Sequence, residues 1–326
     1  MAANFDNALR TQLASRRQKL ENAVASSPGR PDLAALLHEV DAALSRMDIG
    51  TFGLCEVCHD PIESDRLAAD PLLRFCLDHL TEPQQRALEQ DLQLAAHIQS
   101  ALLPKNGLVH GGWRTAFYYR AAGHVSGDYC DLIPAEDGSL YFILGDVSGK
   151  GVAASMLMSH LQAMFRTLAG TGLPLIRMME RASSLFCEST LSNHYATLVC
   201  GRAEKDGNIE LCNAGHLAPL FGKKGTVRPI DATGLPLGMF CSEEFSAESA
   251  KLNQGDCLLL FTDGVSESQN PAGAEFGVQP LVDILRNRRL TTAEGIVDAC
   301  VAKNSAFRSG LSPKDDLTLM VVERID

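Results

Sequence analysis

The sequence predicts an α+β protein in which a helical N-terminal region precedes a domain built mainly of antiparallel sheet. Up to about residue 104, apolar residues recur at helical spacing, except in one stretch that holds a Cys and His cluster. From about residue 107 onward, short β-type runs arrive in hairpin-linked groups with helical segments between them. The 326 residues are enough for one large domain or two unequal ones.

Residues 1–50 predict a helical hairpin. Apolar residues have helical spacing over 5–25, and the segment 26–32 breaks that helix because Pro28 and Pro31 lack backbone donors. A second helix follows, with one apolar stripe made of Leu33, Leu36, Leu37, Val40, Leu44 and Met47. Each helix would be marginal alone, so each needs a partner surface.

Residues 81–104 predict a linker helix that Pro104 ends. One apolar stripe runs from Leu88 to Leu102, while Leu94 and Ile98 form a second. A helix with two such stripes can pack on the following domain and on a second copy of the chain, so we expect a possible homodimer. A plain linker helix that packs only within its own chain is an equally good interpretation.

The C-terminal region has clear strand and helix signals. The strands are expected at 140–145, 196–200, 208–212, 257–262 and 317–322. The helices are expected at about 151–169, 174–191, 278–288 and 292–308. DGS at 137–139 and KDGN at 205–208 are typical of hairpin turns.

Charge and composition limit the class of protein. The net charge of −11 argues against a broad nucleic-acid surface, which needs clustered Lys and Arg. No apolar run approaches the ~20 residues of a membrane span, and the N-terminus has no signal-peptide core. We therefore expect a cytoplasmic protein whose ten cysteines stay reduced. Seven of them are expected to be free and buried: Cys130, Cys187, Cys200, Cys212, Cys241, Cys257 and Cys300.

The other three cysteines form a cluster with a histidine. Cys55-x2-Cys58 and Cys76-x2-His79 are separated by 17 residues. Two ligand pairs with such a spacer are what a tetrahedral Zn²⁺ needs, and four filled positions leave no place for a reactive water. The spacing predicts one structural Zn²⁺ in a module over 51–80.

Residues 41–79 resemble the TraR/DksA-type zinc finger, in which a helix runs into G-x-[FY]-G-x-C-x2-C and a second ligand pair follows a hydrophobic loop. The sequence departs from that pattern at His79, where a fourth Cys is usual. Members of that family can bind RNA polymerase through an acidic tip, but the corresponding tip here is SSPGR. We therefore favour a structural, sensing or oligomerisation role.

Four acidic motifs lie at strand ends or turns of the C-terminal region. SGDYCD supplies Asp128, with Asp131 nearby, and GDVSGKG supplies Asp146. FTDG supplies Asp263, and KDD supplies the adjacent Asp315 and Asp316. Each Asp alone is typical of a turn, but several carboxylates from separate segments are what a hard divalent ion requires.

These motifs, with NAGH, ATGLPLGMF, EFG and DLTLMVV in the same order, resemble the PPM-type metal-dependent protein phosphatases. The resemblance is strongest to the SpoIIE/RsbU branch of bacterial partner-switching systems, and it covers residues from about 92 to 326. It implies a phosphatase domain over 105–326, with two packed antiparallel sheets flanked by helices and two Mn²⁺ or Mg²⁺ ions at one edge.

The resemblance also implies which residues hold those ions. Carried over by motif, Asp146 would bridge the two ions. Asp128 and the backbone carbonyl of Val147 would complete one site. Asp263 and Asp315 would complete the other, with Asp316 as the alternative to Asp315 because the doubled Asp leaves the register open.

The implied function is hydrolysis of phosphoserine or phosphothreonine on a regulatory protein, by a metal-activated water and without a covalent nucleophile. The branch suggests a STAS-type anti-sigma-factor antagonist as substrate, and residues 1–104 as a regulatory unit. Two alternatives remain open: a zinc-finger transcription regulator, and a catalytically silent phosphatase-like binding module.

Three positions leave questions open. Other PPM branches carry a His two residues after the bridging Asp, where this chain has Ser148. His216 is either a general acid or, as we favour, a turn-stabilising residue. Arg120 is the candidate for substrate phosphate binding, and Lys150 in GKG is expected to face solvent, because GKG does not meet the P-loop pattern.

Overall fold

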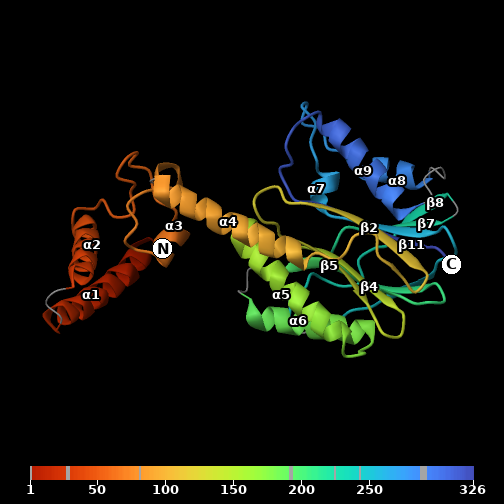
Figure 1. Ribbon diagram of the computed structural model, residues 1–326, viewed down its shortest axis with the longest axis horizontal. Coiled ribbons are helices and arrows are strands. Elements are labelled where there is room, and N and C mark those ends of the chain that lie inside the picture. The colour runs from red at the N-terminus through yellow and green to blue at the C-terminus, as the bar shows by residue number, and fades with distance from the viewer. Residues whose placement is uncertain are drawn as a thin grey trace. The chain divides into compact units, whose positions relative to one another are not determined.

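The computed structural model describes residues 2–26, 30–80, 82–190, 194–223, 225–241, 244–286 and 292–326 (Figure 1). The chain divides into two compact units, Met1–Gln90 and Asp91–Asp326. The division falls inside helix α4, Glu82–Leu102. No helix in the described ranges is long and apolar enough to cross a membrane.

The first unit begins with a pair of helices, α1 (Ala2–Ser26) and α2 (Pro31–Asp48). Leu13 and Leu20 of α1 form a buried core with Val40 and Ala43 of α2. The expected helical hairpin is confirmed, and Pro31 stands in the first turn, where its missing N–H costs no helical bond. Residues 27–29, which make up most of the SSPGR tip, lie outside the described residues.

The Cys and His stretch folds as a small loop-rich module after α2. It contains the short helix α3 (Ser64–Ala69) and the 3-10 turn η1 (Leu77–His79). Ile62 and Leu67 are buried together with Cys55 and Cys76. So small a core supports the module only with additional cross-linking by a metal or another staple.

The second unit contains two antiparallel sheets, with strand orders β1-β2-β11-β10-β7-β8 and β3-β4-β5-β6-β9. The strands of the first sheet are β1 (Val109–His110), β2 (Trp113–Arg120), β7 (Leu220–Lys223), β8 (Thr226–Pro229), β10 (Cys257–Phe261) and β11 (Leu317–Arg324). The strands of the second sheet are β3 (Asp128–Pro134), β4 (Leu140–Val147), β5 (Ala196–Ala203), β6 (Asn208–Ala214) and β9 (Glu248–Lys251).

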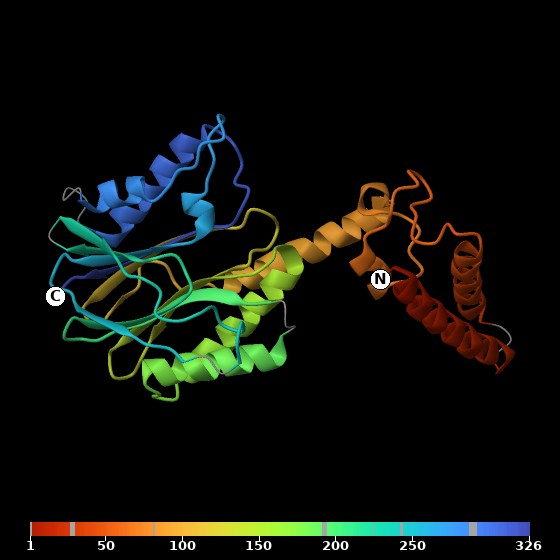
Figure 2. The same cartoon turned by 180° about the vertical axis from the view of Figure 1, so that it is seen from behind.

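Strand alternation explains why the sheets stack and why helices cover their outer faces (Figures 1 and 2). In β4, Leu140, Phe142 and Leu144 lie in the core between the sheets. Tyr141 and Ile143 point the other way, into the core beneath the helices. Because both faces of the strand are buried, its sequence is a continuous apolar run.

The helices of this unit form the two outer layers. The helices on the β4 side are α5 (Gly151–Ala169) and α6 (Leu175–Ser189). The helices beside β10 and β11 are the one-turn α7 (Asp263–Ser266), α8 (Gln279–Arg286) and α9 (Ala293–Arg308). The α+β class with two packed sheets is confirmed, as are the five strands and four helices named from the sequence.

One expectation about the cysteines is wrong. Cys187 at the end of α6 and Cys241 form a disulfide, so they are not two of seven free thiols. The remaining five are free and buried. The spacing of two cysteines 54 residues apart does not predict this disulfide. The pairing depends on how the segment that carries Cys241 returns to α6.

Candidate functional site

The acidic motifs meet at one edge of the second unit because of strand register. Asp128 begins β3 and is paired with Asp146 near the end of β4. A Cβ atom at Gly127 would lie 3.2 Å from the Val147 carbonyl oxygen and 3.4 Å from Asp146 Oδ1. The segment that carries Asp128 therefore runs close beside both of the predicted donors at the end of β4.

The other two motifs are brought together by the pairing of β10 with β11. Phe261 pairs with Leu319, and the Thr262 amide donates to the Thr318 carbonyl at 3.0 Å. Asp263 follows directly as the first residue of α7. A side chain at Gly264 would collide with the carbonyl of Asp316, so glycine allows this close approach.

Two threonines that the sequence analysis did not single out connect the sheets at this edge. The buried Asp128 carboxylate accepts hydrogen bonds from Thr262 Oγ1 at 2.9 Å and from Thr318 Oγ1. These bonds tie β3 of one sheet to β10 and β11 of the other. Each threonine lies within two residues of a candidate ligand, which is the only signal that the sequence offered.

The site is strongly anionic, and burial together with the neighbouring carboxylates raises the pKa of three of its carboxyl groups. Burial and then the charges of Asp263 and Asp315 raise the pKa of Asp146 to about 7. Burial, followed by the charge of Asp315, raises the pKa of Asp263. Burial, followed by the charge of Asp146, raises the pKa of Asp128 well above its usual value. The ionised form of all three carboxyl groups is therefore destabilised, because too little positive charge lies nearby to offset burial and mutual repulsion.

Lys150, at the N-terminus of α5, provides a local cation. Its ammonium Nζ lies 2.7 Å from Asp315 Oδ2 and donates to it. The side chain is largely exposed, as expected, and it is also paired with a candidate ligand.

Two further aspartates have partners of their own. The Asp316 carboxylate accepts from the amides of Ala122 at 2.7 Å and Gly127 at 2.9 Å, so each of its oxygens is engaged. Asp315 is engaged as well, because its Oδ1 accepts from the Asp316 amide at 3.0 Å and its Oδ2 accepts from Lys150, so the two aspartates stay alternatives as a metal ligand. The buried Asp131 forms a two-pronged ion pair with Arg166 of α5, with both distances 2.9 Å, and therefore anchors a helix.

His216 is a structural residue in this fold. Nδ1 lies 2.9 Å from Thr197 Oγ1, and Nε2 lies 3.2 Å from the Phe261 carbonyl oxygen. Burial lowers the pKa of His216 to about 4, so the ring is neutral near pH 7. Of the two interpretations of this histidine, the structure favours the stabilising one, because both ring nitrogens connect strands.

Ser148 and Arg120 complete the predicted set. Ser148 exchanges backbone and side-chain hydrogen bonds with Tyr195 at 2.9 and 3.0 Å, so it fastens the end of β4. Arg120 ends β2, is exposed, and pairs in the ladder with Leu317, two residues after Asp315. Its position next to the acidic edge keeps it a candidate for contact with an anionic substrate.

The donor set suits divalent Mg²⁺ or Mn²⁺. All of the candidate donors are hard oxygens from separate segments, their carboxylates repel one another, and an ammonium group already lies on one of them. Among the described residues, however, these carboxylates do not form a set of three whose donor atoms all lie within 4.8 Å of one another. They reach the same edge without closing on a common centre.

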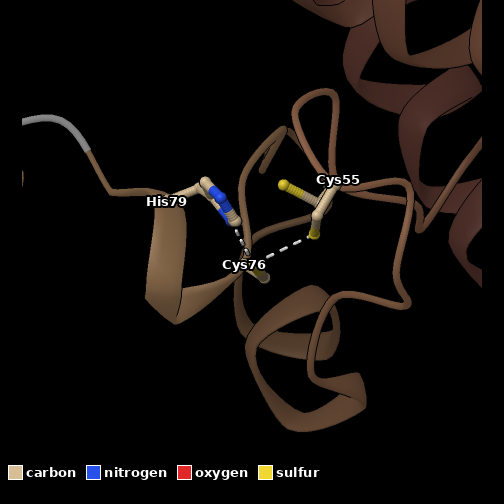
Figure 3. A group of neighbouring side chains, drawn as sticks. Cys55, Cys76 and His79 are labelled. Carbon is tan, nitrogen blue, oxygen red and sulfur yellow. Dashed lines mark hydrogen bonds between the residues drawn. The ribbon is translucent and has the colours of Figure 1, made fainter.

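The Cys and His cluster of the first unit is already gathered. The donor atoms of Cys55, Cys58, Cys76 and His79 all lie within 4.8 Å of one another. Cys76 Sγ is 3.8 Å from Cys58 Sγ and 3.2 Å from His79 Nδ1, and Figure 3 shows the His79 ring turned toward Cys76. Three sulfurs and one imidazole nitrogen are the donors of a closed Zn²⁺ site.

Local amides favour ionisation of one thiol of the cluster, Cys55. Burial opposes ionisation of Cys55, but the backbone N–H groups of Cys58, Cys76 and Val57 outweigh it and lower the pKa of Cys55 to about 6. At Cys58 the Asp60 amide is outweighed by burial and by hydrogen bonds with Cys55 and Cys76, which raise the pKa of the Cys58 thiol to about 11. A thiolate is the form that binds zinc. The four residues therefore fit one Zn²⁺, with every coordination position filled by the protein.

Known proteins resemble both units of the chain. A model of the prokaryotic dksA/traR C4-type zinc finger matches residues 50–78, and the fourth donor here, His79, lies just beyond it. Protein IcfG of Synechocystis is 27% identical over 264 residues, which are 72% of this chain and 41% of that protein. The phosphoserine phosphatase RsbP of Bacillus subtilis is 29% identical over 185 residues, 55% of this chain and 46% of that protein.

A third relative and two solved structures extend the comparison. The phosphoserine phosphatase RsbU of Bacillus subtilis is 23% identical and aligns over 74% of this chain and 72% of its own length. The RsbU and RsbW domains of a Mycobacterium tuberculosis protein share 26% identity at a TM-score of 0.57, covering 68% of this chain and 62% of that chain. The SiaA PP2C domain of Pseudomonas aeruginosa has a TM-score of 0.63 at 18% identity, covering 76% of this chain and all of its own.

The fold of the second unit is therefore that of PP2C-type phosphatases. The chain spans less than half the length of the first two curated relatives. The model of Stage II sporulation protein E (SpoIIE) matches residues 136–325, which is more than half of the chain. By that match, the chain belongs to the SpoIIE family.

Proposed function

We propose that this protein is a metal-dependent phosphatase that hydrolyses phosphoserine or phosphothreonine on a regulatory protein. The observation that carries the proposal is the meeting of four strand-end motifs, with Asp128, Asp146, Asp263 and Asp315, at one edge of a PP2C-type fold. Two relatives named phosphoserine phosphatases, RsbP and RsbU, support the same reaction.

The proposed ligands follow from the motif resemblance. Asp146, Asp128 and the Val147 carbonyl would hold one divalent ion, and Asp146, Asp263 and Asp315 would hold the second. Two Mn²⁺ or Mg²⁺ ions supply an activated water for attack on phosphorus and neutralise charge on the phosphoryl oxygens. Thr262 and Thr318 orient the Asp128 carboxylate through their hydroxyl groups.

The chain's other groups restrict the mechanism. Cys130 lies two residues from Asp128, but burial raises the pKa of its thiol well above the usual value, so it is not a nucleophile. His216 is neutral and bonded through both ring nitrogens, so it does not protonate the leaving group. The serine oxygen of the product takes its proton from solvent in this scheme.

Residues 1–104 are assigned a regulatory role. A zinc site with four protein donors leaves no open position for catalysis, so we assign it to folding of residues 51–80. In α4, Leu94 and Ile98 are 57% and 55% exposed. An apolar pair one helical turn apart on a linker helix is suited to pairing with a second copy of the chain. Light scattering of Leu94→Glu/Ile98→Glu would show a monomer if this pair holds a dimer.

The substrate is proposed to be a STAS-type anti-sigma-factor antagonist. The support is similarity to RsbP and RsbU and to a structure that contains RsbU and RsbW domains. The carboxylates at the site edge repel a phosphate group unless bound cations neutralise them. The metal-loaded enzyme is therefore required for substrate binding as well as for hydrolysis.

The test is hydrolysis of p-nitrophenyl phosphate and of a phosphoserine STAS protein by the full chain, with Mn²⁺ and after dialysis into metal-free buffer. We expect Mn²⁺-dependent release of phosphate that Asp146→Asn abolishes. Glu136→Gln, a surface acid of the β3–β4 turn, is the matched control and keeps full activity. Turnover that is independent of metal, or of Asp146, contradicts the proposal, and absence of turnover despite bound Mn²⁺ indicates a silent binding module.

A further inference from the structure

Lys150 lies in an unusual position for an exposed lysine. Its side chain is 69% exposed, so packing does not hold it. Its ammonium Nζ nevertheless lies 2.7 Å from Asp315 Oδ2 and 3.4 Å from the Lys314 carbonyl oxygen. Gly149 and Gly151 on either side have φ values of 101° and 73°, which only glycine adopts readily, and they turn the chain so that Lys150 faces the acidic edge.

The surroundings of Lys150 are predominantly acidic. Its charge opposes the rise of the carboxyl pKa at Asp146, Asp263 and Glu267. The pKa of Lys150 itself is raised, first by the hydrogen bond to Asp315. The ammonium group therefore interacts with several members of the acidic cluster and makes direct contact with one of them.

A second lysine provides a comparison. Lys314 is adjacent to Asp315 in sequence and lines the same cavity of about 230 Å³ as Lys150. Its Nζ donates to the neutral Gln269 Oε1 at 2.7 Å and has no ion pair among the described residues. Lys150 and Lys314 thus have the same charge and line the same cavity, but only Lys150 donates to a candidate metal ligand in the described structure.

We propose that Lys150 is a built-in counter-cation of the Asp263/Asp315 metal position, which a divalent ion must displace from Asp315 in order to bind there. The inference rests on the proposed function, because it takes these aspartates as metal ligands. A single ammonium charge on a flexible stem relieves repulsion within the cluster but competes with a divalent ion for the same oxygen.

This arrangement makes the two metal positions unequal. The position built on Asp128, Asp146 and the Val147 carbonyl has no lysine in direct contact with its donors in the described structure. In the position that includes Asp315, the Oδ2 oxygen of this residue already accepts a hydrogen bond from the Lys150 ammonium group. The first position therefore fills at lower Mn²⁺ concentration, and the second has an affinity that Lys150 weakens.

The experiment measures Mn²⁺ binding to the zinc-loaded full chain by calorimetry and by the electron paramagnetic resonance signal of free Mn²⁺. Lys150→Met removes the charge and keeps the chain length, Lys150→Arg keeps the charge, and Lys314→Met is the matched control. We expect Lys150→Met to tighten the weaker step about tenfold at low salt. We expect Lys150→Arg to stay within about twofold of wild type, and Lys314→Met to change less than about threefold.

The outcomes separate this inference from the proposed function. If wild type shows two steps and Lys150→Met shifts neither step more than Lys314→Met does, the counter-cation role is overturned while the metal centre stands. If Mn²⁺ binding is the same in wild type and Asp146→Asn, the acidic edge holds no metal and the proposed function itself fails. A tenfold shift that 0.5 M salt largely removes supports a charge effect.

Discussion

The two groups of metal-type donors in this chain differ in how complete they are without a metal. In the first unit, three thiols and an imidazole lie within 4.8 Å of one another. In the second, the candidate carboxylates share an edge but do not gather, and Lys150 lies on one of them. Thiols, a single thiolate and an imidazole can approach one another before a metal arrives, whereas several ionised carboxylates repel one another until a cation lies between them.

This difference matches the chemistry that we propose for each site. A structural zinc finger must define its own fold, so its ligands are arranged by short knuckles and local amides. A hydrolytic centre must keep positions open for water and substrate, so its ligands sit at the ends of strands that a large core already fixes. Loss of a ligand should therefore unfold the first site and relax the second.

The largest effect is expected for Cys76→Ser. Loss of one thiolate opens the zinc site, and because metal binding supplies much of the folding free energy of so small a module, on the order of 10 kcal/mol, residues 51–80 should unfold. Zinc content by mass spectrometry and protease sensitivity measure the result. His59→Asn is the control, because His59 is next to Cys58 but outside the donor set, and this variant should keep its zinc. If Cys76→Ser retains zinc as well, Cys76 is not a required zinc donor.

Asp146→Asn should have the opposite effect on stability and a large effect on activity. Phosphate release should fall by on the order of a hundredfold or more, because the charge that fixes both ions is lost. In metal-free buffer at pH 8, the second unit should melt at a higher temperature than wild type, because the variant removes a buried charge and its repulsion with Asp263 and Asp315. Calorimetry that shows a lower melting temperature would argue against a repulsive cluster.

The stability of the metal-free second unit should also depend on pH. Since the folded pKa of Asp146 is about 7 and its unfolded value is near 3.8, the folded state binds this proton more tightly. The metal-free second unit should therefore gain stability, on the order of 2 kcal/mol, as pH falls from 8 toward 5. Denaturant titrations of wild type and Asp146→Asn at each pH test this, since the variant should lose most of that gain.

The smallest expected effect is at the hydroxyl groups behind the ligands. Thr318→Val removes one of two hydrogen bonds to Asp128 without changing the shape of the side chain much. Mn²⁺ affinity should fall about tenfold, as for other groups that orient a metal ligand. Thr115→Val is the control, because Thr115 is buried on β2 and its hydroxyl donates to the Leu108 carbonyl. Equal losses in both variants would mean a general packing effect.

Much of the fold was predictable because its signals are local. Strands such as β4 and β10 are apolar on both faces, and α5 begins after a turn whose glycines mark it. The clustering of the four Cys and His residues was predictable as well, because knuckle spacing alone brings Cys55 to Cys58 and Cys76 to His79. Short strands at sheet edges, such as β8 and β9, carry too little pattern to be found.

The sequence by itself determined the donor types, the family resemblance and the order of elements, since these follow from residue identity and local spacing. Only the tertiary structure decided which neighbour each polar group meets. It gave Asp315 and Asp316 different hydrogen-bond partners, bonded His216 between strands, paired Cys187 with Cys241, and placed the Lys150 ammonium beside Asp315. These contacts join residues that are distant along the chain, and their formation depends on how two sheets pack rather than on any local pattern.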